Sequence, residues 1–222
     1  MPARKDRPAL TRAAVVAAAV ALADEEGLAA LSMRAVARRL GVEAMSLYHH
    51  VANKDDLLDG MVDAVHEEFH TPVPGQDWAE EMRARSRSAR QALKRHRWAV
   101  GLMDSRRTPG WASMAHHDAV LGCLLEAGFS LALTGHAFAV LDAHLYGFLV
   151  QEVSLPFDGG GADLEEVAAG IMAALPEGTL PYFRRFTLEH ALQPGYDFGD
   201  EFDVGLELVV EGLASRLAAE RG

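Results

Sequence analysis

Residues 31–58 read LSMRAVARRLGVEAMSLYHHVANKDDLL, and this stretch decides the fold. Apolar residues recur at helical spacing on both sides of Gly41, which can adopt the positive φ of a tight turn. Ser32 stands where it can cap a helix over Met33–Leu40, and a second helix is expected over Glu43–His50. Two short helices joined in this way predict a helix-turn-helix, whose second helix enters the major groove of DNA.

The alternative reading of this stretch is an ordinary tight helix pair in an α-helical core. Charge favours DNA, because Arg34, Arg38, Arg39 and Lys54 flank the pair in an otherwise acidic chain. Residues 1–54 carry eight Lys and Arg against five Asp and Glu, a balance of +3, whereas the whole chain carries −11 and the remainder therefore −14. The negative total does not exclude a nucleic-acid partner for the basic end.

The rest of the 222-residue chain shows the 3.6-residue period of helices and almost no alternation, which predicts an all-α protein. The break over Thr71–Gly75 marks a domain boundary. The expected helices outside the central pair cover Arg12–Glu26, Lys54–His70, Asp77–Arg95, 109–127, 131–152, Asp163–Ala174 and Asp200–Ala219.

The N-terminus has the outline of a secretory signal, since Arg4, Lys5 and Arg7 precede the apolar run Ala13–Ala23. The run is mostly alanine and is followed by Asp24-Glu25-Glu26-Gly27, which favours an ordinary helix and its end. No run reaches the ~18 apolar residues of a membrane span. The single Cys123 excludes a disulfide framework. We expect a cytoplasmic protein with no membrane partner.

The stretches LSMRAVARRLGV at 31–42 and SLYHHVANKDDLL at 46–58 resemble the DNA-binding domain of TetR-family regulators. Residues 126–131 and 205–213 resemble the ligand-binding domain of the tetracycline repressor type. The resemblance implies a helix-turn-helix domain over 1–56 and a ligand-binding and dimerisation domain over 57–222, linked by the helix 54–70.

For the DNA-binding domain, the resemblance places residues at the start of the first helix and Lys54 on the DNA backbone, and makes the second helix the recognition surface. The side chains of that second helix suit groove reading, with methyl groups for thymine and hydroxyl or imidazole groups for base edges and phosphates. The implied DNA-binding residues are Ser32, Met33, Arg34, Ala44, Met45, Ser46, Tyr48, His49, His50 and Lys54.

For the effector site, the resemblance implies His70, Arg85, Ala89, Met103, His117, Val120, Phe138, Asp142 and Gln151. Of the polar anchors that hold magnesium-tetracycline in the family, only His70 is retained. Met103 replaces the histidine that binds magnesium and is a poor ligand for a hard cation, while Arg85 and Gln151 replace an asparagine and a glutamate. We therefore expect another drug-sized effector, with no cofactor and no metal site.

Other features have a structural and a functional interpretation. The final helix carries the apolar stripe Phe202, Leu206, Val209, Leu213 and Leu217, flanked by Gly205, Leu208 and Gly212. This stripe is either core or a homodimer interface, which the family builds as a four-helix bundle. His66 is expected to be solvated rather than a zinc ligand, and His116, His136 and His144 to be structural. The basic run from Arg83 to Arg97 is expected to be a solvated face, compensated by Glu80 and Glu81, rather than a second nucleic-acid patch.

Together these features predict a homodimeric, ligand-responsive transcriptional regulator, most simply a repressor. It would bind a pseudo-palindromic operator with half-sites about 34–36 Å apart, and an effector near His70 would change the separation of the two recognition helices. One alternative is a DNA-binding regulator controlled by a protein partner. The other is an enzyme using His117, Asp142 or His144, although the sequence has no nucleophile elbow, metal signature or nucleotide loop.

Overall fold

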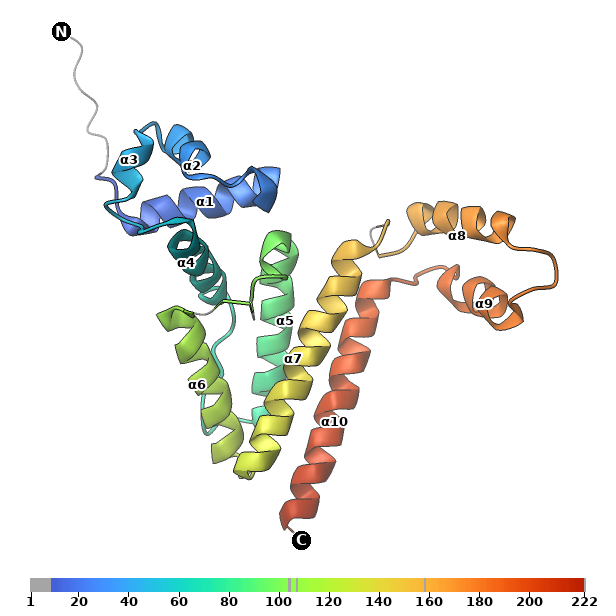
Figure 1. Ribbon diagram of the computed structural model, residues 1–222. Helices are drawn as coiled ribbons and strands as arrows, with labels where there is room; N and C mark the ends of the chain where they lie inside the picture. The colour runs from blue at the N-terminus through green and yellow to red at the C-terminus, as the bar shows by residue number, and fades with distance from the viewer. Residues whose placement is uncertain (1–8, 104, 107, 158, 222) are drawn as a thin grey trace. The chain divides into compact units, whose positions relative to one another are not determined.

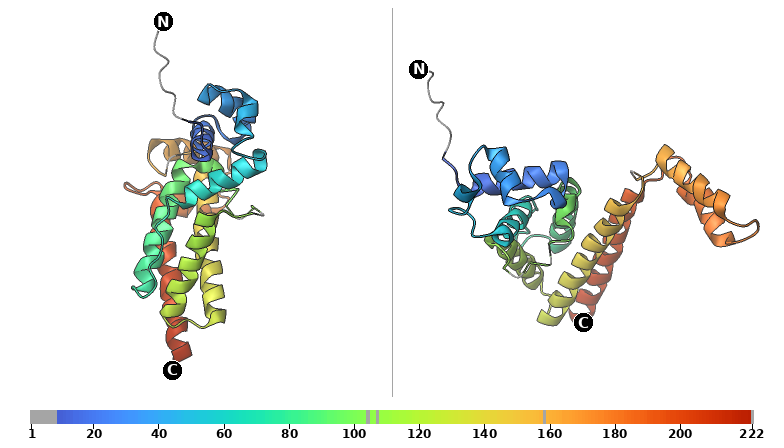
Figure 2. Two further views of the ribbon diagram at one scale, coloured as in Figure 1. Left: turned by 90° about the vertical axis from the view of Figure 1, so that its left-hand side faces the viewer. Right: turned by 45° about the horizontal axis from the view of Figure 1, so that its top comes forward.

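The computed structural model describes residues 9–103, 105–106, 108–157 and 159–221, which form helices joined by loops (Figures 1 and 2). No strand occurs among these residues, so the all-α prediction is confirmed. Arg4, Lys5 and Arg7, on which the outline of a signal sequence depended, lie outside the described residues. The α-helices are α1 Arg12–Glu26, α2 Met33–Leu40, α3 Ala44–Leu47, α4 Lys54–His66, α5 Trp78–Arg95, α6 Trp111–Glu126, α7 Leu131–Ser154, α8 Ala162–Ala174, α9 Pro181–Phe186 and α10 Glu201–Arg221.

Three helix predictions need correction. Helix α3 ends at Leu47 rather than at His50. Helix α4 ends at His66 instead of His70, because the backbone tightens there and Phe69 N–H bonds the carbonyl three residues back. Helix α9 and the π-helical turn Thr187–Ala191 that follows it were missed, since six residues opening on Pro181 are too short to show a period.

Packing divides the chain into two compact units. The first contains residues 1–73 and 87–120, and the second contains residues 74–86 and 121–222. Helices α1 to α4 of the first unit, residues 12–66, form an N-terminal segment that we call the head. Its core is built from the apolar residues Val15, Val16, Ala19, Leu22, Ala23, Leu31, Ala35, Val36, Ala37, Leu47, Val51, Leu57, Leu58 and Met61.

Local capping explains why the helices of the head begin where they do. The side-chain oxygens of Thr11, Ser32 and Asn53 accept the N–H groups three residues further on, at 3.1, 3.2 and 2.9 Å respectively. Each such cap contributes about 1 kcal/mol. Gly41 ends α2 with φ 65°, the left-handed conformation that glycine adopts at low cost. The turn between α2 and α3 is therefore set by sequence-local interactions.

The second unit is organised by α7 and α10, which run side by side in Figure 1 and in the right-hand view of Figure 2. Gly205 of α10 lies against His144 of α7, where a Cβ would come within 2.4 Å of the imidazole. The absence of a side chain at Gly205 thus permits close packing inside one subunit. In the sequence, Gly205 flanks the apolar stripe of the final helix, which is interpreted as either core or a homodimer interface.

Helix α7 also corrects the expectation that no stretch could span a membrane. Its length and mean hydropathy are sufficient for a membrane-spanning helix, but the core helices of globular proteins also reach these values. The helix carries polar side chains, among them Asp142 and Glu152, and packs along α10. These are the properties of a helix packed within a protein.

Candidate DNA-binding surface and effector residues

The recognition helix α3 is anchored by one face and exposes the other. Leu47 is fully buried in the core of the head. Met45 is 73% exposed and Tyr48 is 44% exposed, and His49 is exposed as well. Of the residues expected to read DNA, Met45 on α3 and Tyr48 and His49 just beyond its end are thus exposed. The others in this segment, Ala44, Ser46 and His50, are half-buried.

The remaining expected DNA contacts also serve the fold. Ser32 is exposed, but its hydroxyl caps α2. Met33 is half-buried and packs against the core, whereas Arg34 is exposed. Lys54 Nζ donates to the carbonyl of Leu31 at 2.9 Å and so ties the start of α4 to the loop before α2. The phosphate contact expected of Lys54 stays a prediction.

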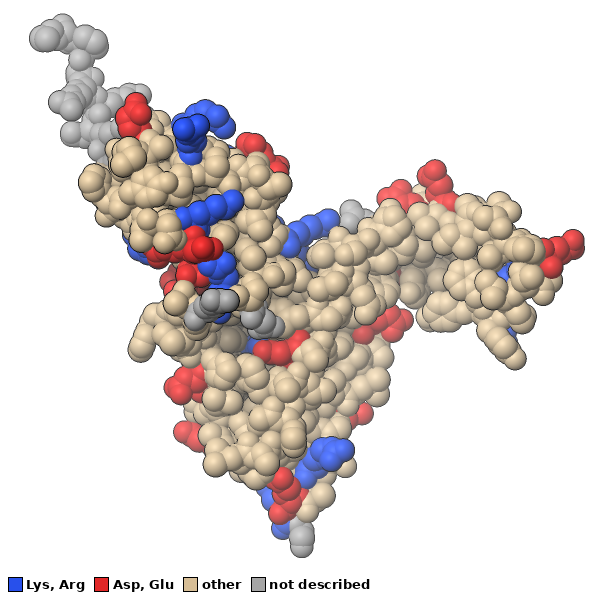
Figure 3. Space-filling model, viewed as in Figure 1, with Lys and Arg blue, Asp and Glu red and all other residues tan. Residues whose placement is uncertain are grey.

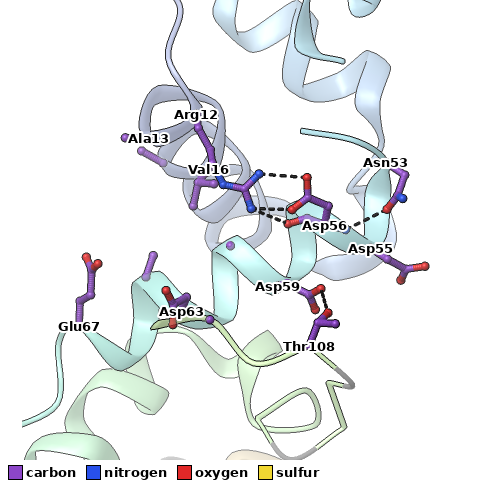
Figure 4. A pocket seen from close by; sticks show the side chains of 14 residues that line it. Arg12, Ala13, Val16, Asn53, Asp55, Asp56, Asp59, Asp63, Glu67 and Thr108 are labelled. Atoms are coloured by element: carbon purple, nitrogen blue, oxygen red, sulfur yellow. Dashed lines mark hydrogen bonds and ion pairs between the residues drawn. The ribbon is translucent and has the colours of Figure 1, made fainter. Parts of the chain in front are cut away.

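An ion pair that the sequence did not indicate holds the recognition helix in place (Figure 4). Arg12 donates to both carboxylate oxygens of Asp56, at 3.0 and 2.6 Å, and to the carbonyl of His50 at 3.2 Å. Asp56 also accepts the N–H of Ala52 at 2.7 Å. These bonds join α1 to the turn that follows α3. The Arg12 guanidinium, more than the Ala52 N–H, keeps the pKa of Asp56 below its ordinary value.

A groove of about 940 Å³ lies between α1 and α4 (Figure 4). Four of its lining residues on α4 and just beyond are acidic and spaced by four: Asp55, Asp59, Asp63 and Glu67. Arg106 partly neutralises them through a 2.5 Å contact with Asp59. Carboxylates repel phosphate, so these side chains make the groove unfavourable for contact with the DNA backbone.

The basic groups around the helix-turn-helix divide into paired and exposed side chains. Arg39 makes a two-pronged ion pair with Glu25, at 2.7 and 2.5 Å, and lowers the pKa of that carboxyl. Arg34 and Arg38 are exposed, and among the described residues no ion pair is recorded for them. Basic side chains are visible on this part of the surface, interspersed with acidic ones (Figure 3).

Five of the expected effector residues belong to the first unit. Ala89, Met103 and Val120 are buried, and His117 is exposed. His70 is half-buried beyond the end of α4, and its backbone N–H donates to Ser88 Oγ at 2.7 Å. Apolar packing therefore holds three of these five residues, and a backbone hydrogen bond ties His70 to α5.

The other four effector residues belong to the second unit. Arg85 and Asp142 meet in an ion pair of 2.5 Å between α5 and α7, and the Arg85 side chain is only 3% exposed. Phe138 is half-buried and Gln151 is exposed. The buried guanidinium corrects the expectation that the basic run is a solvated face throughout. Arg83 pairs with Glu80 at 2.9 Å as expected, but it also pairs with Glu207 of α10 and its side chain is only 19% exposed.

The histidines depart from expectation at two positions. His136 is exposed on α7 rather than a partly buried structural group. His66 is buried, not solvated, and its ring lies beside the rings of Phe69 and His116. Its Nδ1–H donates to the carbonyl of Val62 at 3.1 Å. His144, a candidate for an enzymatic role, donates through Nε2 to the carbonyl of Phe202 at 3.0 Å and stacks on the Phe202 ring. His144 thus has a structural role, as the sequence had indicated.

Comparison with known proteins agrees with this architecture in both parts of the chain. Residues 15–61 match the family described as "Bacterial regulatory proteins, tetR family". Residues 71–217 match the family described as "Tetracyclin repressor-like, C-terminal domain". The chain belongs to the TetR family of bacterial regulatory proteins, and its function is transcriptional regulation.

Particular relatives are similar over nearly their full length. The chain is 32% identical to the HTH-type transcriptional repressor DrrR1 of Streptomyces coeruleorubidus, over 100% of this chain and 83% of that protein. It is 35% identical to the tetracycline repressor protein class A of Escherichia coli, over 91% of this chain and 89% of that protein. The solved structure of ActR from Streptomyces coelicolor with actinorhodin superposes with a TM-score of 0.77 at 28% identity, covering 94% of this chain and 99% of ActR.

Proposed function

We propose that this TetR-family regulator is a repressor that binds a palindromic operator as a homodimer and is released by a small organic effector. The observation that carries the proposal is the recognition helix. Leu47 and the Arg12–Asp56 pair fix its inner face, and Met45 and Tyr48 project outward where base edges would lie. The exposed Arg34 supplies a charge for the phosphate backbone.

Homodimerisation is supported by apolar side chains that α7 and α10 leave exposed. Val140 and Val150 of α7 and Val204 and Leu208 of α10 are all exposed, although their neighbours on the inner faces are buried. Exposed apolar residues gathered on paired helices are typical of subunit interfaces. A four-helix bundle built from α7 and α10 of two subunits would cover them.

The effector is proposed to be a drug-sized molecule other than magnesium-tetracycline. Met103 is a buried thioether, and Arg85 is engaged with Asp142, so neither supplies the oxygen or nitrogen ligands that magnesium-tetracycline needs. The chain is further proposed to be cytoplasmic and to have no enzymatic activity, as is consistent with relatives that are transcriptional regulators.

The test begins by selecting a duplex from a random DNA library with the wild-type protein. We expect a two-fold symmetric sequence that the protein retards in a gel. Met45→Ala should alter the preferred bases, because Met45 offers methyl contact to thymine. His136→Ala, an exposed change on α7, is the matched control and should leave the preference intact. Failure to select any duplex would contradict the proposal.

Effector release is tested separately by a thermal-shift screen of drug-like compounds and secondary metabolites. A compound that raises the melting temperature should also release the selected duplex. A bound compound that leaves DNA affinity unchanged would contradict release by that compound. Release caused only by a protein would favour control by a protein partner.

A further inference from the structure

His96 lies between two carboxylates that come from distant parts of the first unit. It follows the end of α5, and the residue is only 7% exposed. Its Nδ1 lies 2.8 Å from Asp24 Oδ1 on α1, and its Nε2 lies 3.0 Å from Glu68 Oε1, just beyond α4. A single imidazole thus joins three segments of the chain.

The partners of this ring require it to donate twice. An ionised carboxylate only accepts hydrogen bonds, so both ring nitrogens carry hydrogen when both bonds are made. The ring in this arrangement is the imidazolium cation. Burial acts to raise the pKa of Glu68, but the bonds from Arg95 and His96 outweigh it and keep that pKa below its ordinary value.

Neighbouring groups strengthen the same junction. Trp98 Nε1 donates to Asp24 Oδ1 at 2.7 Å, and Arg95 pairs with Glu68. The charged groups facing His96 are therefore Asp24 from α1, Glu68 after α4 and Arg95 from α5. Lys94 and Arg97 line the groove of about 470 Å³ beside them.

We propose that His96 is a positioning residue for operator binding. Its ring is hydrogen-bonded at both nitrogens and so fastens the end of α1 to the segment after α4. The other end of α1 carries Arg12, which holds Asp56 and the carbonyl of His50 after the recognition helix. Fixing α1 therefore fixes the recognition helix. The inference rests on the proposed operator binding.

The main test compares operator affinity in wild type, His96→Gln and His96→Arg, using the duplex selected by the wild type. The Gln side chain cannot donate to both carboxylates from the two positions that the ring nitrogens occupy. His96→Gln should therefore bind the duplex about tenfold more weakly than the wild type.

Two controls separate His96 from other effects. His96→Arg keeps the charge and two donors, so it should restore binding to nearly the wild-type affinity. His136→Gln is exposed on α7 and should bind the duplex as the wild type does. Equal operator affinities of the wild type and His96→Gln would overturn the proposal.

A direct readout tests the junction even if no operator is found. Ring ¹⁵N spectra of the full chain at about pH 6.5 should show hydrogen on both nitrogens of His96. Amide exchange in residues 12–26 should be faster in His96→Gln. A singly protonated ring with unchanged exchange would overturn the proposal. Failure to select any duplex, with both signals present, would instead count against the proposed function.

Discussion

The DNA-binding head and the α7–α10 pair bury their apolar side chains to different extents. In the head, the apolar residues converge on one core, and the outward side chains are mostly polar, with Met45 and Tyr48 as exceptions. In the α7–α10 pair, the inner faces are closed, yet large apolar groups such as Leu208, at 67% exposure, remain on the outside.

This contrast separates two uses of an apolar side chain. The core of the head is closed by Leu47 and its neighbours without Met45, so the exposed Met45 is available to read DNA. The α7–α10 pair keeps more exposed apolar surface than its own fold needs, which supports a second subunit as its cover. Substitutions should therefore affect stability and DNA binding in the head, and assembly in the α7–α10 pair.

The largest expected effect comes from the core of the head. Leu47→Ala should lower the free energy of unfolding by about 2–5 kcal/mol, because the side chain is fully buried and leaves a cavity. Operator binding should be lost with it. Denaturant unfolding and gel shift measure the two quantities. Met45→Ala, two residues away and exposed, should change stability by less than about 0.5 kcal/mol. Equal destabilisation by both variants would contradict the division into inner and outer faces.

The next effect concerns assembly. Leu208→Asp should weaken the dimer by about a hundredfold or more, since it places a charge in the proposed apolar interface. Sedimentation at several concentrations measures this. Met45→Asp is the matched control, because it places the same charge on an exposed apolar site of the head and should leave the dimer intact. A Leu208→Asp protein that stays dimeric at low concentration would exclude this face as the interface.

A smaller effect comes from the pair that fixes the recognition helix. Arg12→Gln should cost about 1 kcal/mol of unfolding free energy at neutral pH, the value of a well-formed, partly exposed ion pair. The folded state lowers the pKa of Asp56, so the pair stabilises the protein above the ordinary value of 3.8, and the contribution is lost as the pH falls through the lower, folded-state pKa.

The difference in unfolding free energy between Arg12→Gln and wild type should therefore become smaller as the pH falls. Urea unfolding at a series of pH values measures it. Arg34→Gln, which removes an exposed arginine, should leave stability unchanged at every pH while weakening operator binding. A constant difference between Arg12→Gln and wild type down to the lowest pH would show that the ion pair is not its cause.

The smallest expected effect concerns the reactivity of the Cys123 thiol. Burial raises the pKa of the Cys123 thiol to about 11, with further contributions from Glu81, Asp77 and Glu126. The native protein should therefore react with a disulfide reagent far more slowly than the unfolded protein at mildly alkaline pH. Absorbance of the released thiolate measures both rates. Equal rates would mean that the second unit opens readily around α6.

The helix-turn-helix could be predicted because its signals are local. A cap bonds an N–H three residues away, and Gly41 needs no distant partner to adopt a positive φ. The ends of α3 and α4 and the whole of α9 could not be placed in this way. Short helices and tightened final turns lack the repeated period on which sequence reasoning depends.

The site residues also divide into those that local sequence patterns predict and those that they do not. The exposure of Met45 follows from its helical spacing from the buried Leu47. The Arg12–Asp56 and Asp24–His96 contacts join residues 44 and 72 positions apart, so no spacing rule indicated them. The burial of His66 and the pairing of Arg85 with Asp142 could likewise not be predicted, because the sequence does not indicate which distant residue a charged or polar side chain will contact.

The sequence by itself determined the helical class, the helix-turn-helix and the family, since caps, turns and apolar period act over a few residues. The tertiary structure decided which charges are paired, which histidines are buried and which apolar residues remain exposed. The physical reason is that ion pairing and burial depend on groups brought together by folding, and their energies depend on how much water the fold excludes.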